Sequence, residues 1–237
     1  MTRARERTGV MGQSYPVGTV VTLATDRSGS VAAARLPRRI AGLSRTGQRR
    51  RGNVPGVTII RLRPEEPADA GAVRRVLAGA FARPDVTTPP EVGLVDELRG
   101  STEWLPALAM VAEYGGEVVG YALLTRVRVR SDHDDVAALV LGPVAVAPHR
   151  QRIGLGSAVV QAALDAAAEQ GERLVVVLGD PAFYRRFGFG RADRLGLTSP
   201  WSGLGEPWQA RVLPSVGGGT GPPAPGEVIF PPPWSKV

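Results

Sequence analysis

The sequence predicts an α/β fold in which a mixed sheet carries helices on its faces. Apolar runs rich in β-branched residues alternate with segments of helical period, in the order β-α-α-β-β-β-α-β-α-β. A glycine-containing loop stands between a long apolar run and an amphipathic helix. The hydrophobic content of 43% over 237 residues is enough to bury a core. These three observations favour a globular domain with short connections.

The first half of the predicted domain contains a strand, two helices and a hairpin. The strand is rich in β-branched residues, and the first helix has proline at its start and an acid in its first turn. A glycine pair between the hairpin strands is a strong turn signal. These elements cover residues 57–62, 67–81, 91–99, 105–114 and 117–129, with Gly115-Gly116 at the turn.

The second half continues with a long apolar strand, a helix, a short strand and a compact helix. The first of these helices has apolar residues at helical spacing and ends at Gly171. Five consecutive apolar residues are typical of a strand covered on both faces. The predicted elements are residues 136–147, 156–170, 174–178 and 181–187, followed by two weaker strands at 208–213 and 227–230.

Basic charge is concentrated in residues 1–56, which hold 11 arginines and 2 acidic residues. The net charge of +7 therefore belongs to this segment and not to the folded body. Its Arg, Gly, Ser and Thr content, with one short candidate strand at residues 17–24, predicts a disordered extension or a mis-assigned start. A transit peptide and a nucleic-acid-binding tail stay open. Nucleic acid is expected as a partner only weakly, through this tail.

Composition argues against several kinds of site. The chain has no cysteine, which rules out disulfides, thiolate zinc sites and a cysteine nucleophile. Its two histidines are His133 and His149, so no metal is expected. No apolar run approaches the roughly 18 residues of a membrane span. We expect a cytoplasmic protein without a membrane partner, and whether it forms a homodimer stays open.

The chemistry centres on the loop Gln151-Arg152-Ile153-Gly154-Leu155-Gly156. Its glycines let the backbone approach a ligand, and the helix that follows directs unpaired N–H groups at an anion. Arg150 and Arg152 add positive charge, so the loop predicts a diphosphate site. A dinucleotide fingerprint would need glycine at Val159, and a Walker loop would need a lysine. From the loop alone, a plain basic turn stays open.

Three further segments, taken with this loop, resemble the GNAT superfamily of N-acetyltransferases. The pattern Gln/Arg-x-x-Gly-x-Gly/Ala is similar to its acetyl-CoA motif, and residues 183–189 match its Phe-Tyr-x-x-x-Gly-Phe element. Residues 141–146 and 177–181 resemble the YhbS-like branch of predicted acetyltransferases. The resemblance divides the chain into an extension (1–56), an N-acetyltransferase domain (57–197) and a Gly/Pro-rich C-terminal extension packing on it (198–237).

The resemblance implies a GNAT-like fold with a central, mostly antiparallel sheet that splays at the acetyl-CoA site and is flanked by helices. It implies an acetyl-CoA-dependent N-acetyltransferase whose amine acceptor is not identified. Tyr184 occupies the position of the acid that protonates the departing thiolate, although it could also be an aromatic core residue. The implied acetyl-CoA contacts are the pantetheine-pairing residues Val144, Ala145 and Val146 and the pyrophosphate-binding residues Gln151, Arg152, Ile153, Gly154, Leu155, Gly156 and Ser157.

The general base is not assigned by the sequence. Many GNAT relatives carry a carboxylate on the strand before the phosphate loop, but residues 136–147 contain none. Asp180 is expected to cap the helix that starts at Pro181, and His149 to be an exposed turn residue or a phosphate contact. The acceptor pocket is expected from residues 81–105 and 198–237. The candidate bases, each of which could equally be a solvated surface group, are Glu103, Glu113, Asp132, His133, Asp134 and Asp135.

The absence of that carboxylate supports one alternative function, a non-catalytic acyl-CoA-binding or regulatory module. Such a module would keep the diphosphate loop without a working acceptor site.

Overall fold

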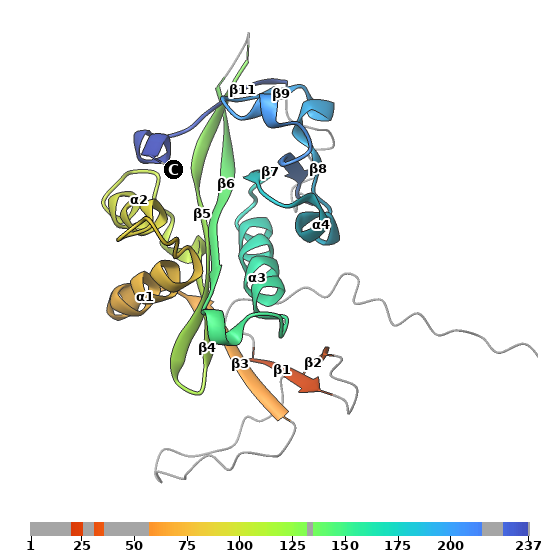
Figure 1. Ribbon diagram of the computed structural model, residues 1–237. Helices are drawn as coiled ribbons and strands as arrows, with labels where there is room; N and C mark the ends of the chain where they lie inside the picture. Colours follow the sequence, from red (N-terminus) through yellow and green to blue (C-terminus); the bar gives the residue numbers. More distant parts are fainter. Residues whose placement is uncertain (1–19, 26–30, 36–56, 132–134, 215–224, 237) are drawn as a thin grey trace, which may run out of the picture.

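A single sheet runs through the computed structural model, which describes residues 20–25, 31–35, 57–131, 135–214 and 225–236. The strand order is β2-β1-β3-β4-β5-β6-β7-β10-β8, and β11 joins both β5 and β9. The pairs β6–β7 and β9–β11 are parallel, and the other described pairs are antiparallel. Figure 1 shows α1 and α2 on one face of β5 and β6, and α3 on the other. The predicted α/β fold is confirmed.

The strands cluster into a central group of long strands and several short ones at the margins. Their bounds are β1 Val20–Thr25, β2 Val31–Arg35, β3 Val57–Pro64, β4 Ala109–Tyr114, β5 Glu117–Arg130, β6 Asp135–Val146, β7 Leu174–Leu178, β8 Gly190–Arg191, β9 Leu197–Thr198, β10 Trp208–Val212 and β11 Gly226–Ile229. The α-helices are α1 Ala70–Ala80, α2 Pro90–Arg99, α3 Leu155–Glu169 and α4 Pro181–Tyr184.

Most sequence-predicted elements appear within a few residues of their expected bounds. Gly115 and Gly116 adopt φ of 61° and 91°, as the predicted tight hairpin requires. One strand begins later than predicted, because Pro106–Leu108 form a 3₁₀ turn and β4 starts only at Ala109. Proline lacks the N–H that a strand ladder needs, which explains the late start.

The described parts of both predicted extensions continue the sheet. Strand β1 pairs antiparallel with β3, and β10 pairs antiparallel with β7. The remainder of residues 1–56 lies outside the described residues, as do the candidate bases Asp132, His133 and Asp134. Strands β2, β8 and β9 were not expected from the sequence. The domain boundaries predicted at residues 56 and 197 stay predictions. Strands before and after each boundary are hydrogen-bonded to one another in the same sheet.

Strand β6 separates from β7 halfway along its length. The ladder between them contains two residue pairs, Leu139–Val175 and Val140–Val176. On its other edge, β6 stays paired with β5 as far as Val146, with a register shift opposite the segment that follows Leu141. Such a shift bends a strand. The second half of β6 therefore has an edge that β7 does not cover.

A buried ion pair anchors α2. The guanidinium of Arg99 donates to Glu65 Oε1 at 3.0 and 2.7 Å, and the Tyr121 hydroxyl donates to Glu65 Oε2 at 3.0 Å. The Glu65 side chain is 4% exposed, and burial raises the pKa of Tyr121 well above its ordinary value, with the Glu65 charge adding to the shift. Breaking such a pair would leave an uncompensated buried charge, which is costly. The pair therefore holds the C-terminal end of α2 against the segment that contains Glu65.

Candidate functional site

A groove of about 660 Å³ opens where β6 leaves β7, and we call it the loop groove. It contains nine of the eleven residues predicted as donor-site or acid residues. Four further residues come from the segment that follows β7. Its lining is Val144, Ala145, Val146, Gln151, Arg152, Gly154, Gly156, Ser157, Gly179, Asp180, Phe183, Tyr184 and Arg186.

The two predicted residues outside that lining, Ile153 and Leu155, direct their side chains to the hydrophobic core. Leu155 is 1% exposed, and Ile153 packs against the same core cluster. Only their backbone could face a ligand. The apolar side chains of the loop therefore anchor it to the core, while its backbone lines the groove.

The loop backbone is bent into an uncommon conformation before α3. Gly154 precedes the helix with φ of 86°, and Arg152 has φ of 63°. A left-handed conformation costs a non-glycine residue on the order of 1 kcal/mol. The side-chain amide of Gln151 donates to the Val146 carbonyl at 3.1 Å, which ties the loop to the end of β6. The bend directs the first turn of α3 toward the groove, where its N–H groups favour an anion.

Two arginines supply positive charge to the groove, and they are not the expected pair. Arg152 and Arg186 line it, and Arg186 Nη1 lies 3.3 Å from the Ser157 hydroxyl while its guanidinium covers the Phe183 ring at 4.9 Å. Arg150 instead stacks on the Tyr114 ring at 4.3 Å, away from the groove. Arg186 was not expected from the sequence, because it stands at a variable position of the Phe-Tyr-x-x-x-Gly-Phe element.

Tyr184 is both a core residue and a groove residue. It is 8% exposed, and its ring packs against those of Phe183, Phe187 and Phe189 at centroid distances of 5.0, 6.5 and 5.7 Å. Burial raises the pKa of Tyr184 to about 12, and the nearby Asp180 charge adds to the shift. The structure shows the aromatic core position, and the acid role of Tyr184 stays a prediction. With this pKa the phenol is protonated at neutral pH.

The described candidate bases all lie elsewhere. Glu103 accepts from the Thr102 hydroxyl at 2.9 Å, which lowers the pKa of that carboxyl. Glu113 is paired with Arg63, and Asp135 with Arg128, at 3.2 Å each. None of these three carboxylates lines the loop groove.

Two other expected side chains have clear positions. Asp180 accepts from the Ala182 N–H at 2.8 Å and caps α4, as predicted. His149 is exposed and does not line the loop groove.

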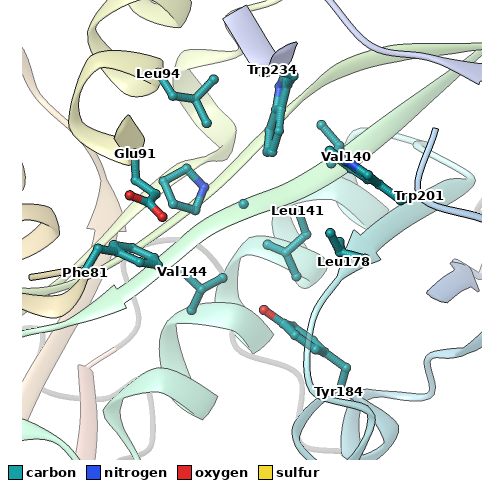
Figure 2. Close-up of a pocket in the computed structure, with 12 residues that line it drawn as sticks. Phe81, Glu91, Leu94, Val140, Leu141, Val144, Leu178, Tyr184, Trp201 and Trp234 are labelled. Carbon is teal, nitrogen blue, oxygen red and sulfur yellow. The ribbon is translucent and has the colours of Figure 1, made fainter. Parts of the chain in front are cut away.

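A second hollow of about 260 Å³ lies beside the same part of β6, and we call it the tryptophan hollow. Figure 2 shows the Glu91 carboxylate and the Tyr184 hydroxyl pointing toward this part of β6 from opposite sides. Sequence reasoning missed Glu91, because an acid in the first turn of a helix is already explained by the helix dipole. The hollow is lined by Phe81, Glu91, Leu94, Val140, Leu141, Gly142, Pro143, Val144, Leu178, Tyr184, Trp201 and Trp234.

Two other kinds of site were sought in the described part of the chain. No three His, Asp or Glu side chains there gather as metal ligands would. No helix in the same residues combines the length and hydropathy needed to cross a membrane.

Comparison with known proteins gives a consistent result. The model of the acetyltransferase (GNAT) family matches residues 81–189. The chain is 33% identical over 153 residues to the uncharacterized N-acetyltransferase YhbS of Escherichia coli K12, an alignment covering 64% of this chain and 86% of YhbS. It is 32% identical over 124 residues to YjhQ of the same strain, covering 52% of this chain and 66% of YjhQ, just under two thirds.

Solved structures of similar fold contain the coenzyme. YhbS from Escherichia coli in complex with CoA has a TM-score of 0.62 and 29% identity, covering 74% of this chain and 92% of that one. A GNAT family acetyltransferase from Brucella melitensis in complex with acetyl-CoA has a TM-score of 0.59 and 27% identity, covering 74% of this chain and 97% of that one.

Proposed function

Because the chain belongs to the GNAT family of acetyltransferases and uses acetyl-CoA as its acetyl donor, we propose that it acetylates a primary amine of a small molecule or protein. The separation of β6 from β7 is the observation that carries this proposal. The uncovered strand edge, the loop predicted to bind an anion and a buried phenol all line one groove, which supports the proposal.

The residues of the loop groove fit the donor. The uncovered edge of Val144–Val146 can pair with the amides of the pantetheine arm, as an added strand would. The pyrophosphate would lie against Gln151–Ser157, where backbone N–H groups, Arg152 and Arg186 offer donors and positive charge. A backbone N–H near Val144 would polarise the thioester carbonyl.

Tyr184 would act as the acid in the transfer step. A neutral amine attacks the thioester carbon, a C–N bond forms, and the C–S bond breaks. The phenol of Tyr184 then gives its proton to the departing sulfur, and the proton that the nitrogen loses as the amide forms returns to the phenolate through solvent. With a pKa of about 12, it holds that proton at neutral pH, where an acid catalyst must be protonated to act.

Replacing Arg186 with alanine is expected to raise the Kd for CoA about fivefold. The lost contact is a charge-assisted one at an exposed position, worth about 1 kcal/mol. Calorimetric titration with CoA would measure it, and the difference from wild type should shrink as salt rises because the charge is screened. Arg185→Ala is the matched control, since Arg185 is exposed and does not line the loop groove. Equal effects of the two changes would argue against a phosphate contact.

A screen for the acceptor tests the proposed function directly. Release of free thiol from acetyl-CoA would be followed across monoamines, polyamines, aminoglycosides, amino acids and peptides with free N-termini, with each product identified by mass. We expect stoichiometric N-acetylation of at least one class. Tight CoA binding without any acetylated product would instead indicate the non-catalytic module, which family membership does not favour.

The proposal includes a cytoplasmic location, in keeping with a chain that has no cysteine to oxidise.

A further inference from the structure

The tryptophan hollow contains a carboxylate that the donor groove does not use. Glu91 Oε2 is buried and has no hydrogen-bond partner among the residues that the structure describes, and the Glu91 side chain is 12% exposed. Its other oxygen accepts from Arg83 at 3.4 Å, a long contact to an arginine that is 60% exposed. A buried carboxylate oxygen without a donor costs free energy, so its retention calls for a partner.

The rest of the hollow is apolar. Glu91 is the one charged residue among those that line it, and the walls are otherwise aliphatic or aromatic apart from the Tyr184 hydroxyl and the indole N–H groups of Trp201 and Trp234. The ring centroids of Trp201 and Trp234 lie 6.2 Å apart, and both rings belong to an aromatic cluster with Phe230 and Trp208. This cluster gives the hollow rigid walls from the C-terminal segment, while α2 provides the carboxylate.

The hollow and the loop groove meet at Val144 and Tyr184, which line both. A molecule in the hollow would therefore reach the point where the groove places the thioester. Its volume of about 260 Å³ lies below the ~300–1,000 Å³ of sites for drug-sized ligands. The hollow fits a small molecule, or one end of a larger one, and has no second charged group for a polyamine or amino sugar.

We propose that the tryptophan hollow is the acceptor site, that its substrate is a small monoamine with an apolar or aromatic body, and that Glu91 binds the ammonium group. This inference rests on the proposed amine acetylation and adds the substrate class. The ammonium would donate to Glu91, and the apolar body would contact Trp201 and Trp234. The aromatic faces of the tryptophans would also attract the positive charge of the ammonium group.

Glu91 also accounts for the missing base. The bound ammonium must lose a proton before its nitrogen can attack, and Glu91 Oε2 accepts that proton. The nitrogen forms its bond to the acetyl carbon, and the C–S bond breaks. The sulfur receives a proton from Tyr184, and the second proton that the nitrogen loses as the amide forms restores the Tyr184 phenol through solvent. Glu91 afterwards returns its proton to solvent.

Binding can be tested without turnover. The CoA-loaded protein would be titrated by calorimetry with 2-phenylethylamine, with 2-phenylethanol, which lacks the charge, and with putrescine, which carries a second one. We expect 2-phenylethylamine to bind at least about tenfold tighter than either. Glu91→Gln should weaken it at least about 30-fold, because a buried carboxylate–ammonium pair loses its charge. Equal binding of all three probes, or of the amine to both proteins, would overturn the inference.

Turnover provides the second readout, with Glu169→Gln as the matched control on an exposed residue of α3. Glu91→Gln should lower kcat/KM for 2-phenylethylamine about 100-fold and leave the Kd for CoA unchanged, which also shows that the variant folds. Putrescine or amino sugars acetylated as well by Glu91→Gln as by wild type would overturn the inference and leave amine acetylation standing. Tight amine binding with no product from any amine would overturn the proposed function instead.

Discussion

Replacing Tyr184 with phenylalanine is expected to lower the turnover number about 100- to 10,000-fold and to change the Kd for acetyl-CoA by less than about twofold. The ring contacts with Phe183, Phe187 and Phe189 involve the ring carbons, so phenylalanine preserves them. The change removes the hydroxyl, which is the group that we propose protonates the departing sulfur. Single-turnover measurement of thiol release, beside calorimetric binding of CoA, separates the two quantities.

The pH dependence of the wild type gives an independent check on Tyr184. An acid catalyst is active below its own pKa, and burial raises that of Tyr184 to about 12 from the ordinary value of about 10. Loss of the Tyr184 proton therefore should not reduce the rate between pH 7 and about 10. A descending limb with an apparent pKa near 10 that disappears in Tyr184→Phe would show a normally titrating phenol and contradict the buried-acid assignment.

Tyr114→Phe is the matched control for this change. Tyr114 is half-buried beneath Arg150 and does not line the loop groove. Its replacement removes the same atom at a position outside the groove and should leave turnover within about twofold. Wild-type turnover in Tyr184→Phe would reduce Tyr184 to a packing residue, the alternative that the sequence leaves open.

Local sequence patterns predict the elements that build the donor groove. Five consecutive apolar residues predict β7 at its observed bounds, and helical spacing predicts α3 to within a residue at each end. The glycines at 154 and 156 predict the anion loop, because the conformation they permit is a local property. Each of these signals depends only on residues that are close together in the sequence.

The tryptophan hollow depends on contacts that no local pattern contains. Its carboxylate is on α2, and its two tryptophans are more than a hundred positions later in the chain. Glu91 gives the same local signal as any acid in a first helical turn, and the burial of its unpaired oxygen is a property of the folded chain. The uncovered edge of β6 is likewise a property of pairing, and the sequence indicated it only through family resemblance.

Gly179 is the residue whose size most directly sets the position of the acid. A Cβ placed at residue 179 would overlap the ring of Tyr184. The backbone there is held from both sides, since its N–H donates to the Pro207 carbonyl at 3.0 Å and its carbonyl accepts from the Gln209 side chain at 3.1 Å. The backbone is therefore less free to move than the ring, so a larger residue should displace Tyr184.

Gly179→Ala is accordingly expected to lower turnover about 100-fold, since a misplacement of about 1 Å can cost that much. Overpacking should also lower the free energy of unfolding by about 1–3 kcal/mol, so denaturation must show that the variant is folded in the assay. Gly190→Ala is the control, because a Cβ there meets no atom within 4 Å. If Gly179 acts through Tyr184, adding Gly179→Ala to Tyr184→Phe should cost almost nothing further, because the hydroxyl is already gone. Additive losses would show instead that Gly179 contributes to the groove on its own, through the donor contact and not through the acid.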